Sequence, residues 1–263
     1  MENKKFIIAI VILSLLLTGT VGFIVYDKFF KKQDETIRTV INGMEIDLNV
    51  FHKIGDTLNN LDAAFNDPTN KYFGYIYGDG NVMIEKLEPS VAAYAAIYKE
   101  IVKTGTNQVI SASLVKSNMN NMFGKYVTYK ADAIEWLDGA FMPYDKDTET
   151  YSQQLPFINP IKDPSYFAVE ISSAIGHDEV IIKRKSYYAE YALDESGTKR
   201  VKASIYTDKS KKTLITTMNL KNGVINEKEV ISKYGSKLNT YTYTFKEYND
   251  TEYVLYSIEK IRK

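Results

Sequence analysis

An uninterrupted apolar run near the start of the chain constrains this sequence more than any other feature. Residues 6–25 read FIIAIVILSLLLTGTVGFIV and contain no charged residue and no proline. As an α-helix, such a run extends about 30 Å, which is the thickness of the hydrocarbon core of a bilayer. Since backbone groups in lipid must find their hydrogen bonds inside the segment, a lone span has to be helical. The run therefore predicts a single transmembrane helix that tethers the rest of the chain.

A cleaved signal peptide is the main alternative to a retained anchor. Signal peptides have a shorter apolar core, of roughly 7–15 residues, followed by a cleavage site made of small residues. Here the best small pair, Thr20 and Gly22, lies inside the run, and a lipoprotein anchor is excluded because the sequence contains no cysteine. The run is followed by YDKFFKK (26–32), whose aromatic and lysine side chains suit the headgroup zone. We therefore expect the anchor to be retained.

The lysines beside the span do not by themselves give its orientation. Their count leans weakly towards a cytoplasmic C-terminus, because Lys4 and Lys5 precede the span whereas Lys28, Lys31 and Lys32 follow it. However, residues 1–5 are too few to form a domain, and a long C-terminal region is translocated largely regardless of its charge. We expect a single-pass protein of the cell membrane whose C-terminal region is extracytoplasmic.

Small residues recur every four positions along the predicted span. Ser14, Thr18 and Gly22 form a narrow stripe on one side of the helix, on which a second membrane helix could pack closely. Small residues are common in membrane helices, however, so a span without a partner is favoured over one with a partner.

Composition describes an ordinary globular region beyond the anchor. Hydrophobic residues make up 44% of the chain and charged residues 25%, which argues against disorder. The absence of cysteine excludes disulfides, thiolate metal sites and cysteine nucleophiles, so the fold must be held by its core alone. Nucleic-acid binding would need a strong basic cluster, and residues 183–185 alone are too few to predict it.

The first part of this region is expected to be rich in helices. Apolar residues at helical spacing predict helices over 51–65, from Pro89 to about Gly105, and over 112–122 with Gly124 as its stop. Residues 34–48 are expected to form a short strand or a lead-in, and 72–77 with 82–84 a hairpin. A strand over 125–131 and a loose hairpin of 141–144 with 151–154 are expected to follow.

The second part is expected to be mainly β. Three of the six prolines, at 156, 160 and 164, mark the best internal boundary. Alternating residues then predict an antiparallel meander with one solvated face, formed by 166–173, 180–191, 201–206, 213–220, about 240–245 and 252–261. A short helix over 227–234 is expected between the later strands, with Asn226 as its N-cap and Gly235 at its end.

Helices first and strands later predict an α+β fold rather than a βαβ one. The expected organisation is a cytoplasmic tail (1–5), the transmembrane helix (6–25), a juxtamembrane linker (26–33), a helix-rich α+β part (34–155), a proline-containing connector (156–164) and a β-rich part (165–263). The last part forms either its own lobe or one domain together with 34–155.

No motif in the sequence carries a recognisable chemistry, so no catalytic, cofactor-binding or metal-binding residue is assigned. His52 and His177 are expected to be surface histidines, because no metal-ligand spacing surrounds them. The acidic run 145–149 lacks the glycine and glutamate of a calcium loop, and the glycines at 74–80 do not form a phosphate-binding motif. A pair of carboxylates brought together by the fold stays possible.

Tyrosine is the one residue type in unusual excess, with 21 in the chain. Exposed tyrosines would offer contact area to a partner protein, a peptide or a glycan. Tyrosine also favours strands and the edges of cores, and we expect most of these residues to be used in that way.

Four segments carry a resemblance to other proteins, namely YDKFFKK, AAYAAIYKEIV, LVKSNMNNMFGKYVTYK and VISKYGSKLNTYTYTF. In these the chain resembles N-terminally anchored, cysteine-free proteins of low-G+C Gram-positive bacteria that are predicted to face outward. The resemblance implies a location and no activity, because it includes no catalytic signature.

Three hypotheses for the function follow. The first is a non-catalytic, membrane-tethered binding or scaffolding domain at the cell envelope, which is favoured by the anchor and by the absence of a catalytic motif. The second is an envelope hydrolase that uses a pair of Asp or Glu residues for acid–base chemistry. The third is an accessory subunit of a membrane complex, held through Ser14, Thr18 and Gly22.

Overall fold

The computed structural model describes residues 38–41, 44–68, 70–78, 80–104, 109–137, 140–152, 165–176, 178–249 and 252–261. The predicted transmembrane helix with its stripe of Ser14, Thr18 and Gly22 lies outside the described residues, as do the linker 26–33 and the connector 156–164. Within the described ranges, no helix is both long enough and apolar enough to cross a bilayer.

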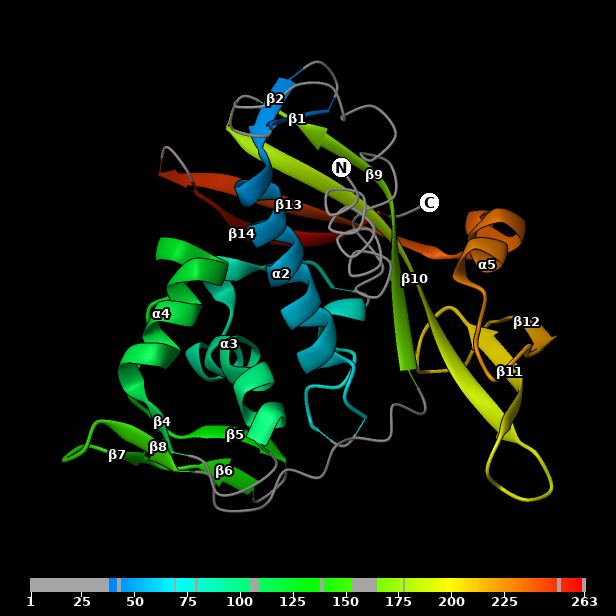
Figure 1. Cartoon of the computed structure of the whole chain (residues 1–263), viewed down its shortest axis with the longest axis horizontal. Helices are drawn as coiled ribbons and strands as arrows, with labels where there is room; N and C mark the ends of the chain where they lie inside the picture. The colour runs from blue at the N-terminus through cyan, green and yellow to red at the C-terminus, as the bar shows by residue number, and fades with distance from the viewer. Residues whose placement is uncertain are drawn as a thin grey trace, which may run out of the picture.

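The chain forms an α+β fold whose first part is helical, as predicted (Figure 1). Among the described residues, the three long helices are α2 (Leu48–Phe65), α3 (Pro89–Thr104) and α4 (Ala112–Phe123). Pro89 opens α3, where its missing N–H costs nothing, and the Ser111 side chain caps α4 by accepting a hydrogen bond from the Leu114 amide. Met119 and Met122 of α4 are buried in the core.

A large antiparallel sheet forms the second part and confirms the predicted meander. Strands follow the order β12-β11-β10-β13-β14-β3, and β9 pairs with β10 from outside this path. Their bounds are β3 (Val82–Met83), β9 (Ser165–Ile175), β10 (Glu179–Leu193), β11 (Arg200–Tyr206), β12 (Leu214–Asn219), β13 (Asn239–Asn249) and β14 (Glu252–Ile261).

Strand β10 organises this sheet because it pairs with three others. Its first half pairs with β13 up to Ser186, and its last residues pair with β11 from Tyr188 onwards. Strand β9 pairs with β10 along both stretches, from Val180 to Ala189. One edge of β10 is therefore occupied by β9, and the other edge is shared by β13 and β11. The sheet therefore branches, and β9 is an edge strand.

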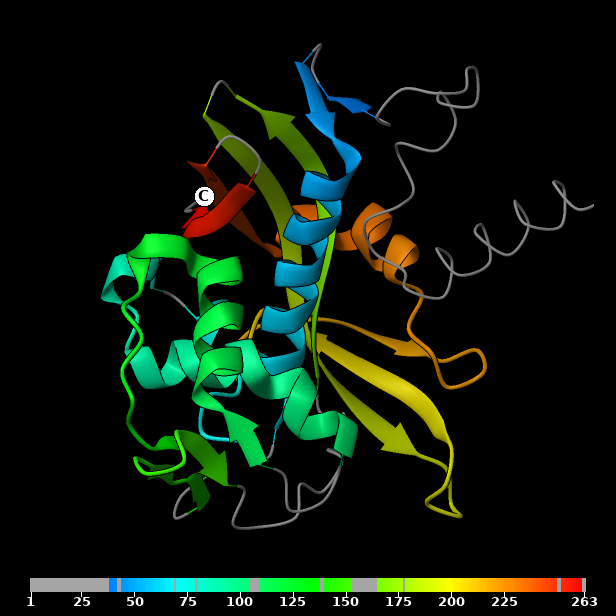
Figure 2. The ribbon, with the colours of Figure 1, turned by 60° about the vertical axis from the view of Figure 1, so that its left-hand side comes forward.

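Helices cover both faces of the sheet (Figure 2). The larger core packs α2, α3 and α4 against one face, with Val180, Ile182 and Tyr243 pointing into it. The smaller core lies on the opposite face under α5 (Glu227–Tyr234), a helix capped by Asn226 as predicted. Its central residue from α5 is Val230, which is fully buried.

The expectation of one solvated face was therefore wrong. The side chains of Ala203 and Ile205 in β11 point into the core under α5. Those of Tyr241, Tyr243 and Phe245 in β13 point towards α2, α3 and α4. Periodicity shows that one face of a strand is buried, but it does not show that two strands bury the same face of the sheet.

Three small sheets complete the part of the fold that the structure describes. They are the hairpin β1 (Arg38–Ile41) with β2 (Met44–Asp47), the set β4 (Val109–Ser111), β8 (Thr150–Ser152) and β7 (Tyr144–Asp145), and the hairpin β5 (Ile134–Leu137) with β6 (Ala140–Met142). The predicted loose hairpin is confirmed for β7 and β8, whereas residues 140–142 pair with β5 instead.

The hairpin predicted for 72–77 with 82–84 was wrong. Residues 71–74 form turns, Tyr75–Tyr77 form a 3₁₀ turn, and β3 pairs with β14. Ile76 and Tyr77 are both buried, which a flat strand cannot achieve because neighbouring side chains point to opposite faces. Gly74, at φ 75°, makes the bend that brings this segment back against the end of α2.

The strand predicted for 125–131 was also wrong. Residues 124–126 form a 3₁₀ turn, and residues 127–131 have no regular structure. Val127 is buried and Tyr129 is partly buried, so the alternation is real, but no strand pairs with this segment among the described residues.

Candidate functional site

The outer edge of β9 is closed by two side chains from neighbouring elements. Asn66, just after α2, pairs with the backbone of Tyr166: its Oδ1 accepts from the amide at 2.6 Å, and its Nδ2 donates to the carbonyl at 2.8 Å. Arg184 of β10 donates from Nη2 to the carbonyl of Ala168 at 2.7 Å. An open strand edge would invite pairing with another chain. These contacts engage the backbone of Tyr166 and the carbonyl of Ala168 near the start of β9 and hold this part of the strand against α2.

Arg184 also forms a buried ion pair with Asp62 of α2. Its Nη1 donates to Oδ1 at 3.0 Å and its Nη2 to Oδ2 at 2.5 Å, and the hydroxyl of Tyr77 donates to Oδ1 at 2.6 Å. Burial opposes the charged guanidinium, but the charge of Asp62 outweighs this and raises the pKa of Arg184. Both oxygens of Asp62 are thus engaged by protein donors.

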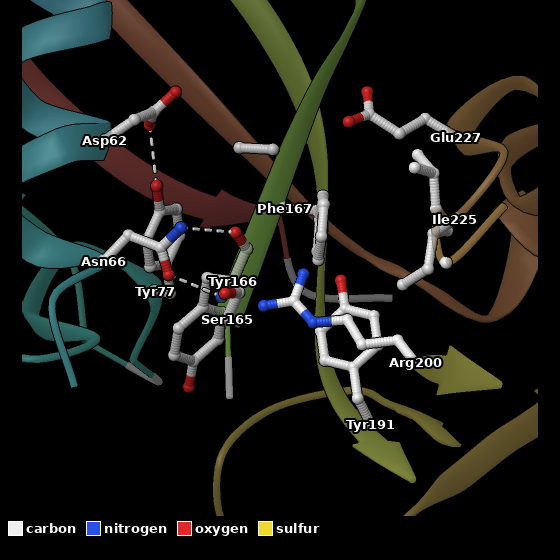
Figure 3. A pocket seen from close by; sticks show the side chains of 13 residues that line it. Asp62, Asn66, Tyr77, Ser165, Tyr166, Phe167, Tyr191, Arg200, Ile225 and Glu227 are labelled. Carbon is white, nitrogen blue, oxygen red and sulfur yellow. Dashed lines mark hydrogen bonds between the residues drawn. The ribbon is translucent and has the colours of Figure 1, made fainter. Parts of the chain in front are cut away.

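A cavity of about 340 Å³ opens around the first residues of β9 (Figure 3). Asp62, Asn66 and Tyr77 line it on the side of α2. Because the cavity passes over the edge of the sheet, its other wall belongs to the opposite face, where the smaller core begins. The aromatic ring of Phe167 lies in its middle, stacked on Tyr187 with ring centroids 5.0 Å apart.

Glu227 projects into the cavity from the first turn of α5 (Figure 3). The Asn226 side chain fixes this end of the helix by accepting a hydrogen bond from the Glu229 amide at 3.2 Å. No described residue donates a hydrogen bond to the Glu227 carboxylate. Burial raises its pKa, since the ionised form loses water there without gaining a donor.

Arg200 supplies the positive charge of the cavity. Its guanidinium lies over the ring of Tyr191, 4.3 Å from the ring centroid, and turns towards Ser165 and Tyr166 (Figure 3). Arg200 and Gly223 also line a second, open cavity of about 620 Å³ at the start of β11. Arg200 therefore borders both cavities.

The histidine and acidic residues considered in the sequence lie away from this cavity. His52 is exposed on α2, as expected, and His177 lies outside the described residues. Asp145 closes a polar turn, where its Oδ1 accepts from the Asp147 amide at 2.8 Å, as expected of a hairpin tip. In the described part of the chain, no group of three or more His, Asp or Glu side chains could hold a metal ion.

The tyrosines fill the core more than they form a surface. Six of them rank among the largest fully buried side chains: Tyr77, Tyr94, Tyr151, Tyr187, Tyr241 and Tyr243. This agrees with the expectation that most tyrosines serve the core. Tyr191 is an exception at the site, because it lines the cavity and stacks with Arg200.

Sequence reasoning missed the three charged residues that line the cavity, Asp62, Arg200 and Glu227, and also missed Arg184, which pairs with Asp62; two of these four residues left a signal. Arg184 is in phase with Val180 and Ile182 on the buried face of its strand, and a charge on an apolar face indicates a buried partner. Asp62 lies beside Leu61 and Leu58 on α2. Arg200 and Glu227 follow turns, and nothing in the local pattern sets them apart.

The fold and the cavity together define an α+β protein with a branched, helix-covered antiparallel sheet and a charged cavity over one sheet edge. No protein-family model, no curated protein and no solved structure matches the chain.

Proposed function

We propose that this protein is a non-catalytic binding domain, tethered to the cell membrane by residues 6–25 and exposed at the cell envelope, which holds its ligand in the cavity around β9. The apolar run and the resemblance to outward-facing anchored proteins support the location. The cavity supports binding, because it combines aromatic walls with a few placed charges, as small-ligand sites do.

The state of Asp62 is the observation that carries this proposal. A hydrolase of the Asp/Glu type needs two free carboxylates, one as acid and one as base or nucleophile. Only Asp62 and Glu227 bring carboxylates to the cavity among its described lining residues. Asp62 is already held by both nitrogens of the Arg184 fork and by Tyr77. Glu227 is then left without a second free carboxylate, which favours binding over hydrolysis.

Single cysteines test the location and the binding together, because the natural chain has none. Lys146→Cys lies in an exposed turn and reports which side of the membrane the domain faces. Val224→Cys lies at the cavity, where Val224 is 68% exposed. Lys221→Cys is the matched control, since Lys221 pairs with Val224 across the same turn, is exposed and lines neither cavity.

A membrane-impermeant maleimide should label Lys146→Cys in intact cells. It should label Val224→Cys more slowly in intact cells than in washed membranes, because the natural ligand then shields the cavity, while Lys221→Cys reacts equally in both. Labelling of Lys146→Cys only after lysis would contradict the location. Equal rates for Val224→Cys in cells and washed membranes would contradict binding in this cavity.

A further inference from the structure

The end of the cavity at α5 combines one carboxylate with a fixed apolar surface. Figure 3 shows the Glu227 carboxylate on one side of Phe167, with Ile225 on the neighbouring wall. Ile225 is buried and belongs to the smaller core, so this wall is firmly placed. Phe167 is held as well, because its ring stacks on that of Tyr187. A ligand at this end therefore meets a negative group beside a stretch of apolar surface.

The Glu227 carboxylate has no hydrogen-bond donor. No described residue donates to it, and burial removes part of its water, which raises its pKa. Its oxygens can therefore accept from a ligand. A partly buried carboxylate in this state gains most from a group that brings N–H donors and a positive charge together.

A second unsatisfied polar group lies beside this end of the cavity. The hydroxyl of Tyr187 is buried and has no hydrogen-bond partner among the described residues. The charge of Glu227 adds to the effect of burial in raising the pKa of this phenol, so the two groups are near enough to interact. A buried hydroxyl without a partner is costly, and its oxygen can accept a hydrogen bond. Carboxylate and phenol together suit a group with several donors, and a primary ammonium has three.

The positive charges nearby do not occupy this end. Arg184 donates to both oxygens of Asp62, and the charges of this pair act on Glu227 with opposite signs. The Arg200 guanidinium lies on the other side of Phe167 from Glu227 (Figure 3). Glu227 therefore keeps a local negative charge, and neither arginine lies where a cation would bind it.

We propose that the cavity binds the primary ammonium group of an aliphatic amine, held by the Glu227 carboxylate with the Tyr187 hydroxyl as a second acceptor, while its carbon chain lies over Phe167 and Ile225. This inference rests on the proposed binding function and names the class of its ligand. A volume of about 340 Å³ lies at the lower end of the range for small-ligand pockets, which suits an amine with a short chain.

Calorimetric titration of the full-length chain in lipid nanodiscs tests this with n-butylammonium, in an amine-free phosphate buffer and with empty nanodiscs as the blank. n-Butylammonium should bind, whereas 1-butanol, which has the same chain and no charge, should bind about tenfold more weakly or worse. Butyltrimethylammonium keeps the charge but has no N–H donor, so it should also bind more weakly. Methylammonium lacks the chain that lies over Phe167 and should lose about tenfold or more.

Substitutions assign the ammonium group to its acceptors. Glu227→Gln should weaken binding of n-butylammonium about tenfold or more and bring it close to that of 1-butanol. Tyr187→Phe keeps the ring that packs on Phe167 and should weaken binding about fivefold, since it removes only a neutral acceptor. Glu229→Gln is the matched control, because Glu229 lies on the same helix, pairs with Lys233 and lines neither cavity, and it should change nothing.

The outcomes separate this inference from the function on which it rests. If Val224→Cys is shielded in cells but n-butylammonium does not bind, the cavity holds a ligand of another class and only this inference falls. It also falls if 1-butanol or the oppositely charged butyrate binds as well as the amine, or if Glu227→Gln binds the amine as wild type does. Unchanged binding in Tyr187→Phe would overturn the second acceptor. If there is neither shielding nor amine binding, the proposed function falls as well.

Discussion

Arg184 and Asp62 join the helices to the sheet at the level of single residues. Arg184 is 3% exposed, donates to both oxygens of Asp62 and also satisfies Ala168. Arg184→Met should therefore lower the free energy of unfolding by about 3 kcal/mol, because it leaves a half-buried carboxylate and a strand carbonyl without donors. Urea denaturation of wild type and variant measures this difference.

Two further variants show whether the loss comes from the pair itself. Asp62→Asn combined with Arg184→Met should cost less than the sum of the single changes, since no unpaired charge remains. Lys233→Met breaks the exposed pair with Glu229 and should leave stability unchanged. Strictly additive effects of the two buried changes would show that the pair is not coupled.

Glu170 of β9 is a second residue whose charge affects the stability of the fold. Its Oε2 is buried without a hydrogen-bond partner, and burial raises its pKa despite the nearby Ser173 hydroxyl and Arg184 charge. The folded state therefore holds the proton more tightly than the unfolded state. Glu170 is therefore most favourable to the folded state at pH values below 4.5, the ordinary pKa of glutamate. This contribution is lost as the pH rises through the raised pKa of the folded state.

Glu170→Gln should remove this penalty. At about pH 7 the variant should be more stable than wild type by about 1 kcal/mol, and at about pH 4 the two should be alike. Thermal unfolding at both values of pH measures the difference. A variant that is less stable at neutral pH would show that the ionised carboxylate has an attractive partner in the folded protein.

The bend after α4 carries the clearest prediction at the scale of elements. Gly124 has φ 54°, and an added Cβ would lie 2.9 Å from Tyr248 and from Val254 on the strands opposite. Gly124→Ala should therefore lower the free energy of unfolding by about 3 kcal/mol, through backbone strain and overpacking together. Chemical denaturation measures the loss.

Gly197 offers a matched control for that change. It has φ 70°, in the same left-handed region, but an added Cβ would meet nothing within 4 Å. Gly197→Ala should therefore cost about 1 kcal/mol, from backbone strain alone. Equal losses at the two glycines would show that the contact of Gly124 with the sheet has no energetic weight.

The elements that the sequence predicted well are those with a long, single period. The face of α2 repeats over several turns and its residues Phe51, Ile54 and Leu58 are buried, so a periodic pattern was sufficient. The segments 72–77 and 125–131 are short and aromatic, and there the tertiary contacts of Gly74 and Gly124 decide the conformation. Pairing partners also stayed hidden, because alternation carries no information about which strand lies alongside.

At the scale of the whole molecule, the sequence did not predict the site, and the reason is related. Its charged residues come from α2, β11 and α5, and they meet only because β9 ends the sheet between two layers of helices. The class α+β follows from the order of helices and strands, but the branching at β10 depends on long-range pairing. A cavity built over a sheet edge leaves no local pattern in the sequence.

The division at 156–164 raises the question of whether the parts before and after it unfold together. The larger core mixes them, since Ile54 and Ile97 from the helices pack in one cluster with Val180 and Tyr243 from the sheet. If either part unfolded, the other would lose the packing contacts that stabilise its side of that core. We therefore expect a single cooperative transition.

Two probes in one urea titration measure this. Trp136, the only tryptophan, lies in β5 of the helix-rich part, and a dye on Val224→Cys reports from the β-rich part. Both signals should change at the same urea concentration. Val230→Ala, which opens the small core under α5, should lower both midpoints equally, with a loss of about 2 kcal/mol. A tryptophan signal that stays fixed while the dye signal moves would show that the shared core does not couple the two parts, and that the proline-containing connector separates independent lobes.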